Sequence, residues 1–87
     1  MLNHTLAFID LETTGLKPSS EIIEMAVIRV RPDDFAILDE WSIKVKPKEI
    51  EKADPEALRV NGYNETDWRD AVDIVVALKI FNEKVKD

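Results

Sequence analysis

Residues 5–16 read TLAFIDLETTGL, and the arrangement expected for the rest of the chain follows from them. Apolar side chains occupy both parities of this segment, because Leu6 and Phe8 share one face while Ile9 and Leu11 share the other. A strand that is apolar on both faces is typical of a buried, central position in a sheet. We therefore expect this segment to lie in the middle of a sheet and to be covered from both sides.

Two further strands are expected downstream of this segment. Residues 21–31 carry apolar side chains on both faces, interrupted by Glu24, and residues 32–34 (Pro-Asp-Asp) mark a turn. Residues 36–46 then alternate between apolar and polar side chains, with an apolar face that begins at Ile37. Two strands joined by a short turn form an antiparallel hairpin, and the simplest sheet places this hairpin beside the first strand.

Two helices are expected after the strands. Residues 54–56 (Asp-Pro-Glu) are typical of a helix N-terminus, and Gly62 is typical of the residue that ends one. Asn64 or Thr66 is expected to cap a second, longer helix. Its apolar side chains recur at helical spacing at Ala71, Ile74, Val75, Leu78, Phe81 and Val85. The fold class is therefore α/β, with a three-stranded antiparallel-type sheet followed by a short and a long helix.

Composition narrows the classes of function. The 87 residues suffice for one domain, and the absence of cysteine excludes disulfide scaffolds, thiolate zinc sites and cysteine nucleophiles. A net charge of −6 argues against a protein that coats nucleic acid through a positive field, but it is compatible with an enzyme that holds phosphate through metal ions. No apolar run is long enough to span a membrane, so we expect a cytoplasmic protein with no membrane partner. His4, the one histidine, is expected to be an ordinary exposed residue.

The expected sheet lacks cover. A three-stranded sheet with its helices on one face leaves the other face bare, whereas the first strand is apolar on both. We therefore expect residues 1–87 to be the N-terminal portion of a single larger domain. The alternative is that a partner protein, or a second copy of the chain, covers the bare face.

Two acids stand at the end of the first strand. Asp10 and Glu12 are two positions apart, so their carboxylates project to the same side and repel one another. A divalent cation between them removes the repulsion, and hard oxygen ligands favour Mg²⁺ or Mn²⁺. Acids at strand ends often face solvent or cap turns, and a D-x-E pair alone is common. The position of this pair, after an apolar strand and before Thr13-Thr14-Gly15, favours a metal site.

The segment FIDLETTGL, followed by EIIEMAVIRV, resembles the first motif of the DEDD-type 3′–5′ exonucleases, which include the DnaQ-like proofreading subunits and ribonuclease T. The later segment ADPEALRVNGY resembles the short helix that follows the third strand in these enzymes. The resemblance covers nearly the whole chain. It implies a ribonuclease H-like fold and hydrolysis of nucleic-acid phosphodiester bonds from the 3′ end, assisted by two divalent ions, Mg²⁺ or Mn²⁺.

The resemblance also assigns roles to individual residues. Asp10 and Glu12 correspond to the first two of the family's four metal-binding acids and are the expected catalytic residues. Glu12 would in addition help to orient the attacking water. Thr13 and Thr14 would contact the terminal nucleotide, partly through the backbone, and Leu16 would form an apolar surface against the last base.

The family's later motifs set a limit on this expectation. The second motif supplies another aspartate, and the third supplies a histidine or tyrosine base with a final aspartate; neither occurs before Asp87. We therefore expect little or no catalysis from residues 1–87 alone. Expected partners are single-stranded or 3′-terminal DNA or RNA, a polymerase, or the C-terminal part of the same domain. The alternatives are a non-catalytic nucleic-acid-binding or protein-interaction module that retains the exonuclease fold, and an accidental D-x-E-T-T-G.

Overall fold

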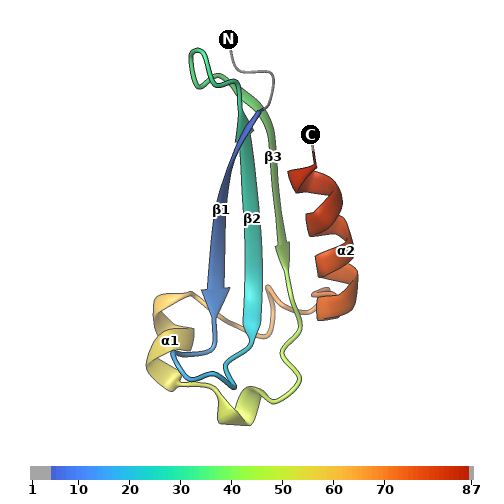
Figure 1. Cartoon of the computed structure of the whole chain (residues 1–87). Helices are drawn as coiled ribbons and strands as arrows, with labels where there is room; N and C mark the ends of the chain where they lie inside the picture. The colour runs from blue at the N-terminus through green and yellow to red at the C-terminus, as the bar shows by residue number, and fades with distance from the viewer. Residues whose placement is uncertain (1–4, 87) are drawn as a thin grey trace.

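The protein forms a twisted antiparallel sheet with one long helix against it (Figure 1). The computed structural model describes residues 5–86, so His4 lies outside the described residues. The elements in chain order are β1 (Leu6–Thr13), β2 (Ile22–Val30), β3 (Ile37–Lys44), the 3₁₀ helix η1 (Ile50–Lys52), α1 (Pro55–Val60) and α2 (Ile74–Val85). The prediction of three antiparallel strands followed by a short and a long helix is confirmed.

The prediction that β1 is the central strand is wrong. The strand order is β1-β2-β3, so β2 has two neighbours and β1 lies at an edge. Phe8 and Ile9 of β1 are 55% and 50% exposed, whereas Ile23 and Met25 of β2 are buried. The reason is that, within residues 5–86, β1 pairs with β2 alone and its apolar side chains are covered only in part on either face.

The register assigns each residue of β1 to one face of the sheet. Leu11 lies opposite Met25, which belongs to the buried core, whereas Asp10 lies opposite Ala26 and Glu12 opposite Glu24. Directly opposed residues of an antiparallel pair project to the same side, and neighbours along a strand project to opposite sides. The two acids of β1 therefore lie on the face of the sheet that is opposite to the core.

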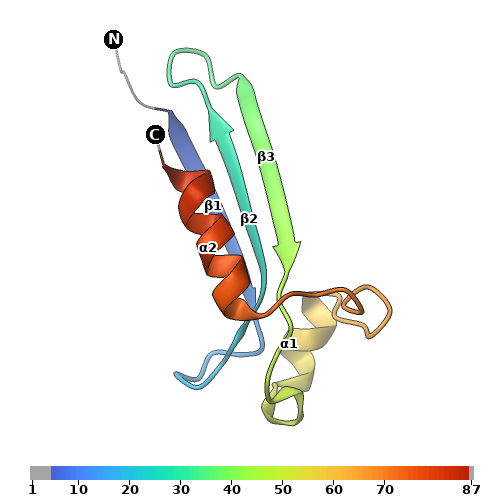
Figure 2. The same ribbon diagram turned by 90° about the vertical axis from the view of Figure 1, so that its right-hand side faces the viewer.

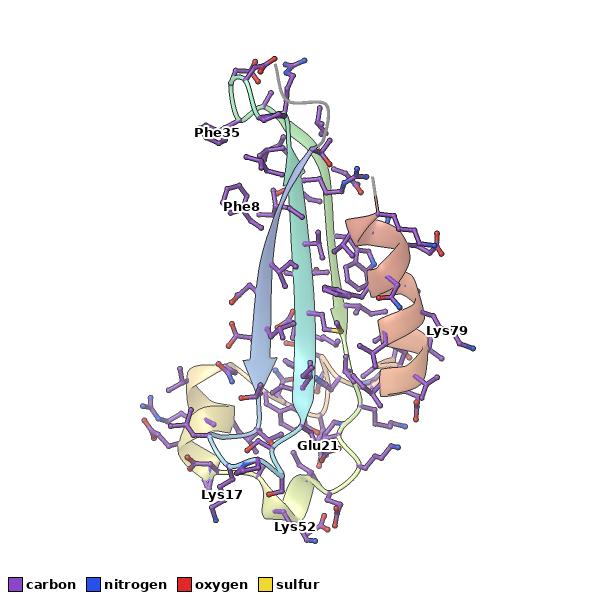
Figure 3. All side chains as sticks on the ribbon, viewed as in Figure 1. Phe8, Lys17, Glu21, Phe35, Lys52 and Lys79 are labelled. Carbon is purple, nitrogen blue, oxygen red and sulfur yellow. The ribbon has the colours of Figure 1, made fainter. Side chains whose placement is uncertain are left out.

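The core lies between the sheet and α2, which runs across one face (Figure 2). Its buried members are Met25, Val45 and Ala77, and the partly buried apolar residues packed against them are Ile22, Trp41, Ile43, Val72, Ile74 and Phe81. On the other side of the sheet, Phe8 and Phe35 project away from α2 (Figure 3). The expectation of one covered and one bare face therefore holds for the described residues.

The short helix α1 follows its predicted boundaries. The Asp54 side chain accepts a hydrogen bond from the Glu56 backbone N–H at 3.0 Å, and Pro55 is the first helical residue. Gly62 follows the C-cap residue Asn61 with a φ of 72°, a left-handed conformation that glycine adopts without steric strain.

The long helix begins later than predicted. Its N-cap is Asp73, whose side chain accepts from the Val75 backbone N–H at 2.8 Å, and neither Asn64 nor Thr66 caps it. Asn64 instead accepts from the Asp67 backbone N–H at 2.7 Å and forms a separate turn. The helix cannot start there because the chain first passes beside β3 at Val72, which forms a parallel bridge with Val45. Neither helix in residues 5–86 has the length and apolar character that crossing a bilayer requires.

The third strand is shorter than predicted, and its apolar face is covered only in part. Ile37, expected on the buried face, is 60% exposed, whereas Trp41 and Ile43 pack against the core. The helix α2 covers the half of the sheet near Val45, and Ile37 lies at the other end of β3.

Trp68 connects the segment between the helices to the central strand. Its indole is buried, and Nε1 donates a hydrogen bond to the Ile23 carbonyl at 2.9 Å. The Tyr63 ring lies 4.9 Å from the Trp68 ring, and Lys44 Nζ lies 4.8 Å from the ring centroid. The 64–70 turn is thus held in place by one large side chain.

We expect Trp68→Phe to lower the free energy of unfolding by about 1–3 kcal/mol, because the buried Ile23 carbonyl loses its donor. Urea denaturation followed by circular dichroism measures this. The matched control is Trp41→Phe, at a partly buried core position where the structure of residues 5–86 shows no indole hydrogen bond. An equal loss in the two variants would assign the effect to ring size and not to the hydrogen bond.

Candidate active site

Asp10 and Glu12 lie next to one another on the bare face of the sheet, close to the end of β1. Asp10 is exposed and Glu12 is half-buried. The strand places both carboxylates on one side, as the two-residue repeat of a strand requires. The structure therefore brings the two predicted acids together.

The surroundings of Glu12 disfavour its charged form. Partial burial, the charge of Asp10, a side-chain hydrogen bond with Asp10 and the charge of Glu24 together raise the pKa of Glu12 above its usual value of 4.5. The influence of Asp10 on this pKa shows that the two carboxyl groups are close enough to interact. Such a pair binds a proton or a cation more readily than an isolated carboxylate does.

Glu24, which lies opposite Glu12 on this face, is held by a lysine. Its carboxylate accepts a hydrogen bond from Lys44 Nζ at 3.1 Å across the β2–β3 pair. The remaining ion pairs between described residues lie elsewhere, in the hairpin turn, along η1 and α1, and at Lys84 and Lys86. Within residues 5–86, neither Asp10 nor Glu12 is therefore neutralised by a lysine or arginine.

The loop after the two acids is fixed by its own hydrogen bonds. Thr13 Oγ1 donates to the Gly15 carbonyl at 2.9 Å. Thr14 is buried, its backbone N–H donates to the Glu21 carbonyl at 2.9 Å, and its Oγ1 accepts from the Glu21 N–H at 2.9 Å. Thr14 thus closes the 14–21 loop, whereas its predicted contact with a nucleotide stays a prediction.

Gly15 lies at a closely packed point of this turn. A Cβ at Gly15 would lie 3.1 Å from Ser20 Oγ, so the serine side chain would have to move slightly, and 3.4 Å from the Asp54 Cβ, an ordinary packing distance. The segment before α1 therefore packs directly against the loop at Gly15.

Two contacts from the α1 region hold the same loop from the other side. The Asp54 backbone N–H donates to the Thr14 carbonyl at 2.8 Å, and the Asn61 side-chain amide donates to the Thr13 carbonyl at 2.9 Å. The sequence analysis missed both contacts. Asn61 and Thr13 are 48 positions apart, and the spacing of residues along the chain carries no signal for such a pair.

A cavity of about 500 Å³ lies between the loop and the segment that precedes α1. It is lined by residues 14–17, 19–21, 49 and 52–55. Leu16 lines it, and its side chain is fully exposed. Lys17, Glu21 and Lys52 lie at the same end of the molecule (Figure 3). Leu16 is therefore a solvent-exposed apolar side chain beside a cavity, and it is available for contact with a ligand.

The donor chemistry of the site fits a hard divalent ion. Asp10 and Glu12 offer carboxylate oxygens, the ligands that Mg²⁺ and Mn²⁺ prefer. Within residues 5–86 there is no group of three or more histidine, aspartate or glutamate side chains arranged to hold a metal ion. The pair accordingly supplies part of a ligand set, and the ion would keep most of its waters.

Comparison with known proteins assigns the chain to a family. The RNase T exonuclease family profile matches residues 7–87, and the chain therefore belongs to this family of exonuclease domains. A comparison with curated protein sequences finds no match. The predicted membership of the DEDD exonucleases, and of a hydrolase family, is confirmed.

Solved structures of nucleases share the fold. A crystal structure of a full-length 3′-exonuclease matches with a TM-score of 0.73 and 22% identity, over 88% of this chain and 27% of that one. The crystal structure of cell-death related nuclease 4 (CRN-4) matches with a TM-score of 0.74 and 21% identity, over 91% of this chain and 29% of that one. The chain thus spans less than a third of the length of these two nucleases.

We expect Glu12→Gln to stabilise the metal-free protein above the usual glutamate pKa. Because the folded-state pKa of Glu12 is raised, its contribution to stability is complete below the unfolded-state value of 4.5 and is lost as pH rises through the raised value. Thermal unfolding in chelator should give equal midpoints for the two proteins at acid pH and a higher midpoint for the variant at neutral pH.

The matched control is Glu65→Gln, which neutralises an exposed glutamate in the 64–70 turn. A pH-independent difference between wild type and Glu12→Gln would contradict the electrostatic origin of the effect, as would an equal gain in the Glu65 control.

Proposed function

We propose that this protein is a 3′–5′ exonuclease that hydrolyses nucleic-acid phosphodiester bonds, with Asp10 and Glu12 as metal-binding, catalytic residues. One observation carries the proposal: two carboxylates interact on one open sheet face and have no cationic partner within residues 5–86. Because the chain belongs to the exonuclease family, we expect this pair to bind catalytic metal ions. The substrate class proposed is single-stranded or 3′-terminal DNA or RNA.

The chemistry follows from the donors. Asp10 and Glu12 would hold Mg²⁺ or Mn²⁺, which when bound activates water and offsets negative charge on the phosphate. Glu12, which shares the open sheet face with Asp10, would also accept a hydrogen bond from the attacking water. The fixed backbone at Thr13 and Thr14 would position the terminal nucleotide, and the exposed Leu16 would contact its base.

The proposal treats residues 1–87 as the N-terminal portion of one exonuclease domain. The exposed apolar side chains of β1 on both faces, and the bare face around Phe8, support it. The chain also covers less than a third of the length of each matched nuclease, which supports the same proposal. On this basis the remaining acids and the general base come from the rest of the domain, and residues 1–87 by themselves have little or no activity.

We expect Asp10→Ala to abolish Mn²⁺ binding, because it removes one of two paired carboxylates. Isothermal calorimetry on wild type and variant, with circular dichroism as a check of folding, measures this. Asp33→Ala, which removes an exposed carboxylate from the hairpin turn, is the control and should leave the isotherm unchanged. Indistinguishable isotherms for wild type and Asp10→Ala would reject the metal pair.

Polarity and chemistry are tested on the full-length protein with 5′-labelled single-stranded DNA and RNA. The expected products shorten one nucleotide at a time from the 3′ end, in a reaction that requires Mg²⁺ or Mn²⁺ and is lost in Asp10→Ala and Glu12→Gln. Binding of the strands without cleavage would instead favour a non-catalytic module that retains the fold.

A further inference from the structure

Asn61 reaches from the end of α1 to the strand that carries the acid pair. Its side-chain Nδ2 donates to the Thr13 carbonyl at 2.9 Å. Figure 1 shows α1 beside the end of β1, at the point where the loop leaves the sheet. Thr13 is the residue immediately after Glu12, so this contact acts on the backbone next to a proposed metal ligand.

The sheet alone does not fix the backbone at this point. Glu12 pairs with Glu24, but Thr13 pairs with Ile22, so the regular register is lost between Glu12 and Thr13. Irregularities of this kind disrupt the ladder of hydrogen bonds and change the direction of the strand. The orientation of the peptide between Thr13 and Thr14 therefore depends on contacts other than the regular β1–β2 ladder.

Asn61 and Glu21 supply these contacts. The peptide group between Thr13 and Thr14 has its carbonyl bound by the Asn61 amide and its N–H bound by the Glu21 carbonyl, at 2.9 Å in both cases. A peptide group is planar, so fixing its oxygen and its N–H fixes its orientation. Two short contacts thus replace the ladder where the register is lost.

The Asn61 backbone is fixed by the end of α1. Its backbone has helical angles of φ −85° and ψ −1°, and its N–H donates to the Ala57 carbonyl at 3.0 Å. The Asn61 side chain therefore extends from the fixed C-terminal end of α1. Asp54 caps the other end of this helix, and its backbone N–H donates to the Thr14 carbonyl. Asn64, three residues later, contrasts with it, since its amide contacts Gly62 and Asp67 within its own turn.

We propose that Asn61 is a positioning residue of the exonuclease site. Through the Thr13 carbonyl, it holds the end of β1 in the orientation that presents the Glu12 carboxylate beside Asp10. The inference rests on the proposed function, because it gives Asn61 a role in the metal site formed by these two acids. Groups that orient metal ligands without touching the metal typically change metal affinity by about 10–100-fold when removed.

The test compares Mn²⁺ affinity with stability in the 87-residue chain. Asn61→Ala and Asn61→Leu both remove the donor, and the second keeps a side chain of similar size. We expect each folded variant to bind Mn²⁺ about 10-fold more weakly than wild type in calorimetry. Asn64→Ala is the matched control, since it also deletes a hydrogen-bonded asparagine amide, and it should keep wild-type affinity at a comparable or larger loss of thermal stability.

Four results separate the possible failures. Wild-type Mn²⁺ affinity in either folded Asn61 variant overturns the positioning role. An equal loss of affinity in Asn64→Ala also overturns it, because the effect then follows general destabilisation. If Asp10→Ala binds Mn²⁺ as wild type does, the proposed metal pair itself fails, and the role of Asn61 fails with it. If only Asp10→Ala loses binding, the metal pair stands and Asn61 has no part in it.

Discussion

The closeness of the Asp10 and Glu12 carboxylates is the constraint on which the candidate site depends. The two groups share one side of a strand, and partial burial together with the charge of Asp10 raises the pKa of Glu12. A globular protein gains nothing in stability from such a pair, and Lys44 neutralises Glu24 but not these two acids. The surrounding structure holds the pair in place nonetheless, through the β1–β2 ladder on one side and the α1 segment on the other.

The site thus depends on parts of the chain that are far apart in sequence. Thr14 closes its loop onto Glu21, while Asp54 and Asn61 bind the carbonyls of Thr14 and Thr13. Gly15 lies where these segments pack together, and a Cβ there would approach Ser20 Oγ to 3.1 Å. The short helix α1 therefore supports the site through the backbone, and it contributes no carboxylate to the acid pair.

The sequence predicted those features of the fold that depend on interactions between neighbouring residues. The two-residue spacing of Asp10 and Glu12, the Asp54-Pro55 helix start and the end of α1 at Gly62 were all readable, because strand alternation and capping involve neighbouring residues. The edge position of β1 could not be predicted. Apolar side chains on both faces indicate that a strand needs to be covered, but they do not indicate which segment covers it. The late start of α2 was missed because Val72 first pairs beside β3, and the Asn61 contact spans 48 residues.

The open edge of β1 has a consequence for association between copies of the chain. An exposed strand edge with apolar side chains is a template for stacking further strands, the geometry that leads to fibrils. In an in-register stack, each copy of Asp10 and Glu12 would lie about 4.8 Å from its own equivalent in the next copy. Like charges at that spacing oppose growth of the stack, so the same two acids act as gatekeepers against aggregation. A divalent ion bound at the proposed site would offset these charges and weaken this protection.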